Sequence, residues 1–218
     1  MKRRTKATPR RRAQGRPNEG KNAVGPELLL KAARELLEIL PPAKVTRAAL
    51  ARHAGVDPNL IRYYFADRDS LLLSVVEQIV NDTTSAERPE RQGTAPERLR
   101  SQVRAFLEFN TRYPFFHRLL VEEISNWKTA RARQVFHRLN QSSLTLYTAI
   151  LKDGAKDKSL VAVDPALLNI ALIGMSEFFL GSRYLLEDAY GKGATPAEHA
   201  KRYADTVVQL VVEGIRTR

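Results

Sequence analysis

Apolar residues recur at helical spacing along most of the chain beyond residue 25. In the first such stretch, Pro26 fits the first helical turn, and Pro41 with Pro42 ends the helix because proline cannot continue one. The apolar positions between them share one helical face: Leu29, Ala32, Ala33, Leu36, Leu37 and Leu40. The pattern therefore predicts a helix that begins at Pro26 and stops before Pro41.

The stretch VTRAALARHAGVDPNLIRYYF, residues 45–65, predicts two short helices in place of one long helix. Thr46 and Asp57 are both good N-cap residues, because a side-chain oxygen can accept from the free N–H groups of a first turn. An apolar residue precedes each cap and another lies four residues beyond it, which is the spacing of a hydrophobic staple: Val45 and Leu50, Val56 and Ile61. Gly55 lies between the two helices, where we expect a positive φ and a clash for any Cβ.

The remaining pattern predicts a fourth helix after Asp67, a polar linker at SAERPERQGTA (residues 85–95) and a second group of helices. Several start signals mark that second group: the capping boxes Thr94/Glu97 and Thr195/Glu198, and the pair Asp164–Pro165. We place its helices near residues 95–112, 115–125, 128–153, 165–190 and 196–216. No alternation typical of a strand occurs, so the predicted fold class is all-α.

The charge of the chain is concentrated at its N-terminus. The 218 residues carry a net charge of +12, and residues 1–25 hold nine basic residues against one acidic residue, which leaves +4 for the other 193. This segment has too few apolar groups to order itself, so we interpret it as a flexible basic arm. Such asymmetry indicates an anionic partner, either nucleic acid or an acidic membrane surface.

Two short helices joined by a tight glycine turn form a helix-turn-helix, whose second helix fits a DNA major groove. That helix carries Asn59 and Arg62, which can make bidentate contacts to base edges, and Tyr63 and Tyr64, whose hydroxyls commonly reach phosphates. Arg68, at the start of the next helix, is a further phosphate candidate. The alternative is an ordinary glycine turn inside a helical bundle. The paired caps and staples and the adjacent basic arm favour DNA binding.

The stretch VTRAALARHAGVDPNLIRYYFADRDSLL resembles the TetR family of bacterial transcriptional regulators over about residues 26–82. The residues that match the family pattern are Ala54, Gly55, Val56, Asp57, Phe65, Arg68 and Leu71. Three positions depart from it: Arg62 where the family usually has tyrosine, Tyr64 where it often has histidine, and Arg68 in place of the usual lysine. A guanidinium at Arg62 could read guanine directly.

The resemblance implies a ligand-responsive repressor that binds a palindromic operator as a homodimer. It divides the chain into the arm (1–25), a helix-turn-helix DNA-binding domain (26–84) and a helical effector-binding and dimerisation domain (94–218). Two recognition helices about 34–36 Å apart would read successive major grooves. It also places the start of the second helix near phosphate. The candidate DNA-binding residues are Thr46, Arg47, Pro58, Asn59, Leu60, Arg62, Tyr63, Tyr64 and Arg68.

The second group of helices carries the candidate effector site. Regulators of this kind hold an apolar ligand among aromatic side chains. The candidates for lining the pocket are Phe106, Phe109, Trp127, Phe178 and Phe179. The alternative is that these aromatics are ordinary core residues. We expect the polar residues nearby to be ordinary solvated or capping groups: His117, Arg118, Glu122 and Glu123.

Two apolar helices close the chain. The helix near 165–190 is apolar on nearly every side, and the last helix carries a run of apolar residues: Val207, Val208, Leu210, Val211, Val212 and Ile215. We expect both helices to build a four-helix interface between two copies of the chain. The alternative is that both are core helices of a monomer.

Other classes of protein fit the sequence less well. The four histidines are scattered, and no metal-ligand pair, Walker loop or nucleophile elbow occurs, so we expect neither an enzyme nor a cofactor or metal site. With no cysteine, no secretory signal and no membrane-length apolar run, we expect a cytoplasmic protein without a membrane partner. The remaining alternative is a nonspecific binder of nucleic acid or anionic surfaces, driven by the arm.

Overall fold

The computed structural model describes residues 25–85, 92–126, 129–191, 193 and 195–217. The basic arm and most of the predicted linker lie outside these residues. The described chain is all-α, as the pattern predicts, and its one β-type pairing is an isolated antiparallel bridge between Leu160 and Arg216. Within the described residues, no single helix has the length and apolarity to cross a membrane, although one bent pair of helices passes together on these criteria.

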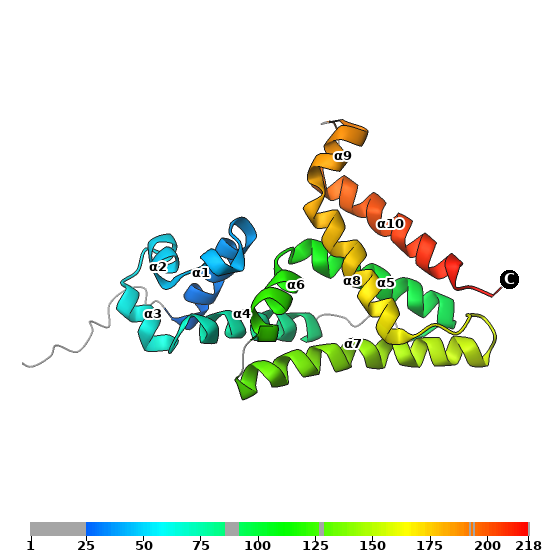
Figure 1. Cartoon of the computed structure of the whole chain (residues 1–218), viewed down its shortest axis with the longest axis horizontal. Coiled ribbons are helices and arrows are strands. Elements are labelled where there is room, and N and C mark those ends of the chain that lie inside the picture. Colours follow the sequence, from blue (N-terminus) through cyan, green and yellow to red (C-terminus); the bar gives the residue numbers. More distant parts are fainter. Residues whose placement is uncertain (1–24, 86–91, 127–128, 192, 194, 218) are drawn as a thin grey trace, which may run out of the picture.

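Four helices form the N-terminal part (Figure 1). They are α1 (Pro26–Ile39), α2 (Arg47–Ala54), α3 (Pro58–Tyr64) and α4 (Arg68–Ser85), with a short 3-10 turn, η1 (Pro42–Lys44), between α1 and α2. Each begins where its start signal predicts. The 3-10 turn was not predicted; in it the N–H groups of Lys44 and Val45 bond to the carbonyls of Pro41 and Pro42.

The described residues of the C-terminal part form six helices and two irregular turns. They are α5 (Ala95–Arg112), α6 (Phe116–Arg118), the π-helical turn η2 (Leu119–Glu123), the 3-10 turn η3 (Ile124–Asn126), α7 (Ala130–Lys156), α8 (Pro165–Gly181), α9 (Arg183–Tyr190) and α10 (Pro196–Gly214). Both predicted capping boxes are present, with Glu97 and Glu198 accepting from the backbone N–H of Thr94 and Thr195.

Two predicted helices are interrupted in the structure. The helix expected over 165–190 breaks at Ser182, where α8 and α9 meet at 72°, because a glycine–serine pair at this point favours a kink. The helix expected over 115–125 is divided into α6, η2 and η3. A π-helical turn of this kind widens the hydrogen-bond ring by one residue and is frequent near functional sites.

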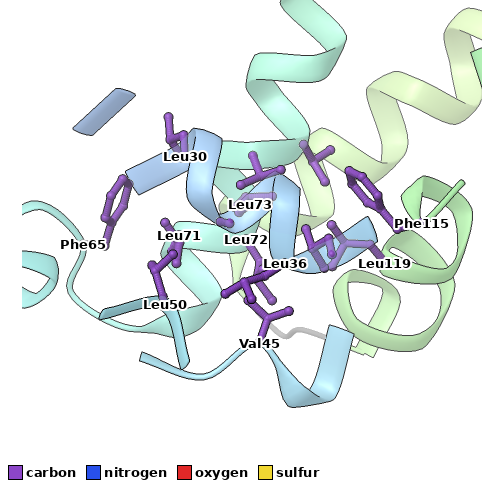
Figure 2. Packing of buried hydrophobic residues seen from close by; sticks show 14 of the residues in the cluster. Leu30, Leu36, Val45, Leu50, Phe65, Leu71, Leu72, Leu73, Phe115 and Leu119 are labelled. Atoms are coloured by element: carbon purple, nitrogen blue, oxygen red, sulfur yellow. The ribbon is translucent and has the colours of Figure 1, made fainter. Parts of the chain in front are cut away.

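The buried apolar residues form two clusters, and their boundary does not coincide with the predicted domain boundary. The first cluster contains the core of α1–α4 together with a later segment, from Phe115 to Val135. Figure 2 shows Phe115 and Leu119 of that segment in one cluster with Leu36 of α1. The second cluster joins α5, α7, α8 and α10. The described residues of the segment 115–135 are therefore packed with the N-terminal helices, although they follow the linker in sequence.

Candidate functional site

Local hydrogen bonds fix both helices of the helix-turn-helix. The Thr46 hydroxyl accepts from the Ala49 N–H at 3.2 Å, and the Asp57 carboxylate accepts from the Asn59 N–H at 2.7 Å, so both predicted caps are confirmed. Val45 and Leu50 of the first staple are both fully buried. Ile61 of the second staple is also buried. These contacts set the angle at which each helix leaves its turn.

The turn between the two helices depends on the backbone conformation of Gly55. This residue has φ of 65° and ψ of 34°, the left-handed conformation that ends α2, so the expected positive φ is confirmed. A Cβ at Gly55 would meet no atom within 4 Å, so the expected clash is wrong. Glycine is favoured here by the cost of the left-handed backbone and not by lack of space.

The α3 helix presents one polar face to solvent. Asn59 and Arg62 are exposed, and Tyr63 is the most exposed aromatic of the described chain, at 79%. Tyr64 is less exposed, at 36%, and its ring packs edge-on against that of Tyr63 with centroids 5.0 Å apart. Ile61 is buried on the opposite face, which anchors the helix to the core. This face has the composition of a base-reading surface.

The other predicted contacts near the start of α2 and α3 are also at the surface. Thr46, Arg47 and Pro58 are exposed, whereas Leu60 is half-buried. Hydrogen bonds from the hydroxyl and the N–H of Ser70 hold the pKa of Asp67 below its usual range, so this carboxylate stays ionised at the start of α4. The starts of α2 and α3 and the exposed face of α3 make up the candidate nucleic-acid interface, which we call the reading head (residues 46–64).

Arg68 occupies a different environment from the one predicted. Its guanidinium donates to the carbonyls of Pro42 at 2.5 Å and Val45 at 3.0 Å, and to both carboxylate oxygens of Glu123 at 3.0 and 3.1 Å. The side chain is only 24% exposed, so in this conformation it is committed to partners inside the chain. Arg68 joins the loop before the reading head to the turn η2. Glu123 is correspondingly not the solvated group that the sequence suggested.

A second link joins α4 to the C-terminal helices. Arg131, at the start of α7, forms a bidentate pair with Glu77 in the middle of α4, and this pair raises the pKa of Arg131. Arg34 of α1 lies over the ring of Tyr113, 5.6 Å from its centroid. These contacts connect the N-terminal helices to the C-terminal part at three separated points, counting the Arg68–Glu123 pair.

A cavity with a volume of about 660 Å³ lies among α5, α8, α9 and α10. Its lining is mainly apolar, with three polar residues, Thr111, Glu187 and His199. Of the five predicted pocket aromatics, Phe179 lines it. Its volume is in the range of small-molecule sites.

The other predicted pocket aromatics lie elsewhere. Phe178 is 67% exposed on the outer face of α8, because adjacent helical residues point about 100° apart and Phe179 takes the inner direction. Phe109 packs edge-on against Phe116, and Phe106 packs against the ring of His117. Trp127 lies outside the described residues. The aromatics therefore do not form one common lining, and Phe106 and Phe109 are partly buried packing residues.

Three polar side chains meet inside the C-terminal part, where the sequence indicated only solvated groups. They are Asn110 of α5, His117 of α6 and Glu177 of α8, which we call the polar cluster. Burial lowers the pKa of His117 to about 4, and burial raises the pKa of Glu177. Among the described residues, no group of three or more His, Asp or Glu side chains could hold a metal ion.

The outer face of α8 is an apolar stripe. Leu167, Ile170 and Phe178 are each more than 60% exposed, and Ala171 and Gly174 lie between them on the same face. The valines of α10 are buried within their own chain, and the expected four-helix interface between two copies stays a prediction. They pack into the second apolar cluster with α5 and α7, and Leu210 remains exposed at 65%.

Comparison with known proteins assigns the family. The model of bacterial regulatory proteins of the tetR family matches residues 29–75, and the model of the tetracyclin repressor-like C-terminal domain matches residues 94–218. The chain therefore belongs to the TetR family of transcriptional regulators, whose members bind operator DNA and often respond to ligands.

Individual relatives agree with this assignment. The chain is 30% identical over 94 residues to the HTH-type transcriptional regulator BetI 2 of Chromohalobacter salexigens, a match that covers 43% of this chain and less than half, 45%, of that relative. It is 23% identical over 173 residues to RutR of Escherichia coli K12, covering 78% and 80% of the two chains.

Solved structures share the fold. The TetR-family member SCO3833 of Streptomyces coelicolor superposes with a TM-score of 0.64 at 23% identity, over 87% of this chain and 91% of that one. AibR, solved with isovaleryl coenzyme A and operator DNA, superposes with a TM-score of 0.67 at 14% identity, over 84% of this chain and 95% of AibR. FadR of Bacillus subtilis, solved with stearoyl-CoA, superposes with a TM-score of 0.57 at 17% identity, over 87% of this chain and 98% of FadR.

Proposed function

We propose that this protein is a ligand-responsive repressor that binds a palindromic operator as a homodimer. The observation that carries the proposal is the exposed face of α3, which presents Asn59, Arg62 and Tyr63 on a helix anchored by its opposite side. Asn and Arg are the side chains with which proteins most often read adenine and guanine in the major groove. A rigid, capped helix can enter that groove without reordering the chain.

The apolar stripe of α8 supports the homodimer. A soluble monomer rarely exposes a continuous row of large apolar side chains, and such a row marks an interaction surface. Ala171 and Gly174 within the row are small, so the backbones of two α8 helices can approach closely. An interface of this kind is isologous, since the same stripe faces itself across a two-fold axis. That axis would give the operator its two-fold symmetry.

The contacts between the two parts of the chain would couple ligand binding to the position of the reading head. The reading head is joined through α4 and the Arg68–Glu123 pair to η2, which packs with the N-terminal core but adjoins the C-terminal helices. A ligand that alters the position of this segment would alter the separation of the two reading heads. It can shift the equilibrium only by its differential affinity for the two states, about 5.5 kcal/mol for a change from 1:99 to 99:1.

The test is selection of bound fragments from a random DNA pool with the full-length protein. We expect a consensus with two-fold symmetry and half-sites one helical turn, or a multiple of it, apart. Enrichment of no sequence, together with a steep salt dependence, would instead favour nonspecific binding driven by the arm. A consensus without symmetry would retain DNA reading but contradict the dimer.

A further inference from the structure

The polar cluster has a defined hydrogen-bond direction. The side-chain N–H of Asn110 donates to the carbonyl of Phe106 at 2.8 Å, which leaves the amide oxygen of Asn110 as an acceptor. That oxygen lies 2.6 Å from Nδ1 of His117, so Nδ1 carries the proton and donates. Asn110 is only 1% exposed and the His117 side chain 11%, so the pair is fixed inside the domain.

The remaining groups of the cluster are acceptors. With a pKa of about 4, His117 is neutral at pH 7, and a neutral imidazole protonated at Nδ1 keeps a lone pair at Nε2. Oε1 of Glu177 lies 4.0 Å from Nδ1, too far for a hydrogen bond. This oxygen is buried and has no hydrogen-bond partner among the described residues. A buried acceptor without a donor is costly, so the site is suited to a molecule that brings one.

Each residue of the cluster lies within three positions in sequence of a residue that lines the cavity. Thr111, which lines the cavity, follows Asn110 directly in α5. Leu180, which also lines it, lies three residues beyond Glu177 in α8, about one helical turn away, and Pro114 lies in the turn that precedes α6, three residues before His117. The charged residue among the described lining residues is Glu187, and none of them is lysine or arginine. An apolar chain in the cavity would therefore have hydrogen-bond acceptors close to its lining in sequence and no cation from the lining itself; Arg118, outside the lining, acts on Glu177 together with the like charge of Glu122.

We propose that the polar cluster binds the head group of the effector, and that this effector is an apolar molecule with a cationic N–H head, such as a primary alkylammonium. Glu177 accepts from the ammonium, His117 accepts at Nε2, and Asn110 holds the imidazole in the tautomer that can accept. The apolar tail occupies the cavity. This inference rests on the proposed ligand-responsive function and names the chemical class of the ligand. It separates this chain from the neighbours solved with coenzyme A thioesters, which are polyanions.

The experiment uses three probes with the same eight-carbon tail: octylamine, 1-octanol and octanoate. Binding to the full-length protein is measured by calorimetry at pH 7 without DNA. We expect octylamine to bind at least about tenfold more tightly than octanoate, because a hydrogen bond to a charged partner is gained in one case and an unpaired carboxylate is buried in the other. Equal binding, or tighter binding of octanoate, overturns the proposal without requiring any variant.

Variants locate the head group. Glu177→Gln should remove most of the preference for octylamine and leave 1-octanol unchanged, while thermal unfolding checks that the variant is folded. Glu108→Gln, a surface carboxylate of α5, is the matched control and should keep the wild-type preference. If Glu187→Gln removes the preference and Glu177→Gln does not, the head group binds at Glu187 and the proposal fails.

The inferred ligand class and the ligand-responsive function can be contradicted independently of each other. Preferential binding of octylamine without any effect on operator affinity would support the site and contradict the ligand-responsive function. Release of the operator by an anionic molecule, with no preference for octylamine, would support the function and overturn the inferred ligand class.

Discussion

The guanidinium of Arg68 binds Glu123 through both carboxylate oxygens, at 3.0 and 3.1 Å, although 55 residues separate the two in sequence. The same guanidinium holds the carbonyls of Pro42 and Val45, on either side of the turn that leads into α2. One side chain thus connects the approach to the reading head with the turn η2 of the C-terminal part. Arginine suits this position because its planar fork can donate to several acceptors at once.

Removing the charge of Glu123 should therefore destabilise the protein. Glu123→Gln leaves a partly buried guanidinium with a neutral acceptor, and we expect the free energy of unfolding to fall by about 1–3 kcal/mol. Urea denaturation at pH 7 measures this. Asp69→Asn is the control, since Asp69 is half-exposed and 3.4 Å from the same guanidinium, and it should cost less than about 1 kcal/mol. Equal losses in the two variants would contradict the central role of Glu123.

The start of nearly every helix could be predicted because the signals are local. Thr46, Asp57 and Asp164 each cap the helix that follows them through an N–H two or three residues away. Because these capping signals act over two or three residues, they can be recognised in the sequence whatever the tertiary structure is. The same is true of the positive φ at Gly55, which the turn between two capped helices requires.

The partners of Arg68 and His117 could not be predicted for the opposite reason. Arg68 stands at a helix start, a position equally suited to a phosphate contact, and its partner Glu123 is chosen by the packing of residues 115–135 on the N-terminal core. The outward direction of Phe178 likewise depends on which side of α8 finds neighbours, since nearly every side of that helix is apolar. These partners and directions are determined by packing between residues far apart in the chain, which cannot be read from a single sequence.

The buried imidazole of His117 should make stability depend on pH. In the unfolded chain it takes up a proton near pH 6.5, but in the folded protein only near pH 4. Above pH 6.5 both states are neutral and the group adds nothing. As the pH falls below 6.5 the unfolded state binds the proton first, so stability is lost, by about 2 kcal/mol at pH 5.

Urea denaturation at pH 7 and pH 5 measures this loss. His117→Gln, which can still donate an N–H to Asn110, should reduce the difference between the two pH values. His137→Gln, at an exposed site on α7, should leave the difference as in the wild type. The same difference in all three proteins would show that His117 does not titrate as the structure requires.

Substitutions at Gly55 should separate backbone conformation from crowding. Gly55→Ala should cost about 1–2 kcal/mol, the usual penalty for a side chain in the left-handed conformation. Gly55→Asn should cost less although asparagine is larger, because asparagine tolerates that conformation and the added Cβ meets open space. Thermal unfolding of the two variants ranks them. A greater loss for Gly55→Asn would mean that the turn is crowded after all.

Contacts from α3 and from the basic arm should differ in sequence dependence. Asn59→Ala and Arg62→Ala should each weaken operator binding by about 1–3 kcal/mol and relax the consensus, with little effect on random DNA. Arg52→Ala removes an exposed charge from α2 and is the control for charge alone. Removal of residues 1–21 should weaken binding to all DNA and flatten its salt dependence. If all these changes act alike on random DNA, the arm alone drives binding.

A charge on the apolar stripe of α8 should separate the two subunits of the proposed dimer. Ile170 is 62% exposed at the middle of the stripe, and Ile170→Asp introduces the charge twice because both copies contribute the same face. Burial of two unpaired carboxylates should raise the dimer dissociation constant at least about 100-fold. Sedimentation at micromolar protein should then give the mass of a single chain. Ile39→Asp, at a 70% exposed isoleucine of α1, is the matched control and should remain dimeric. If the Ile170→Asp variant remains dimeric, the two subunits meet through a surface other than this stripe.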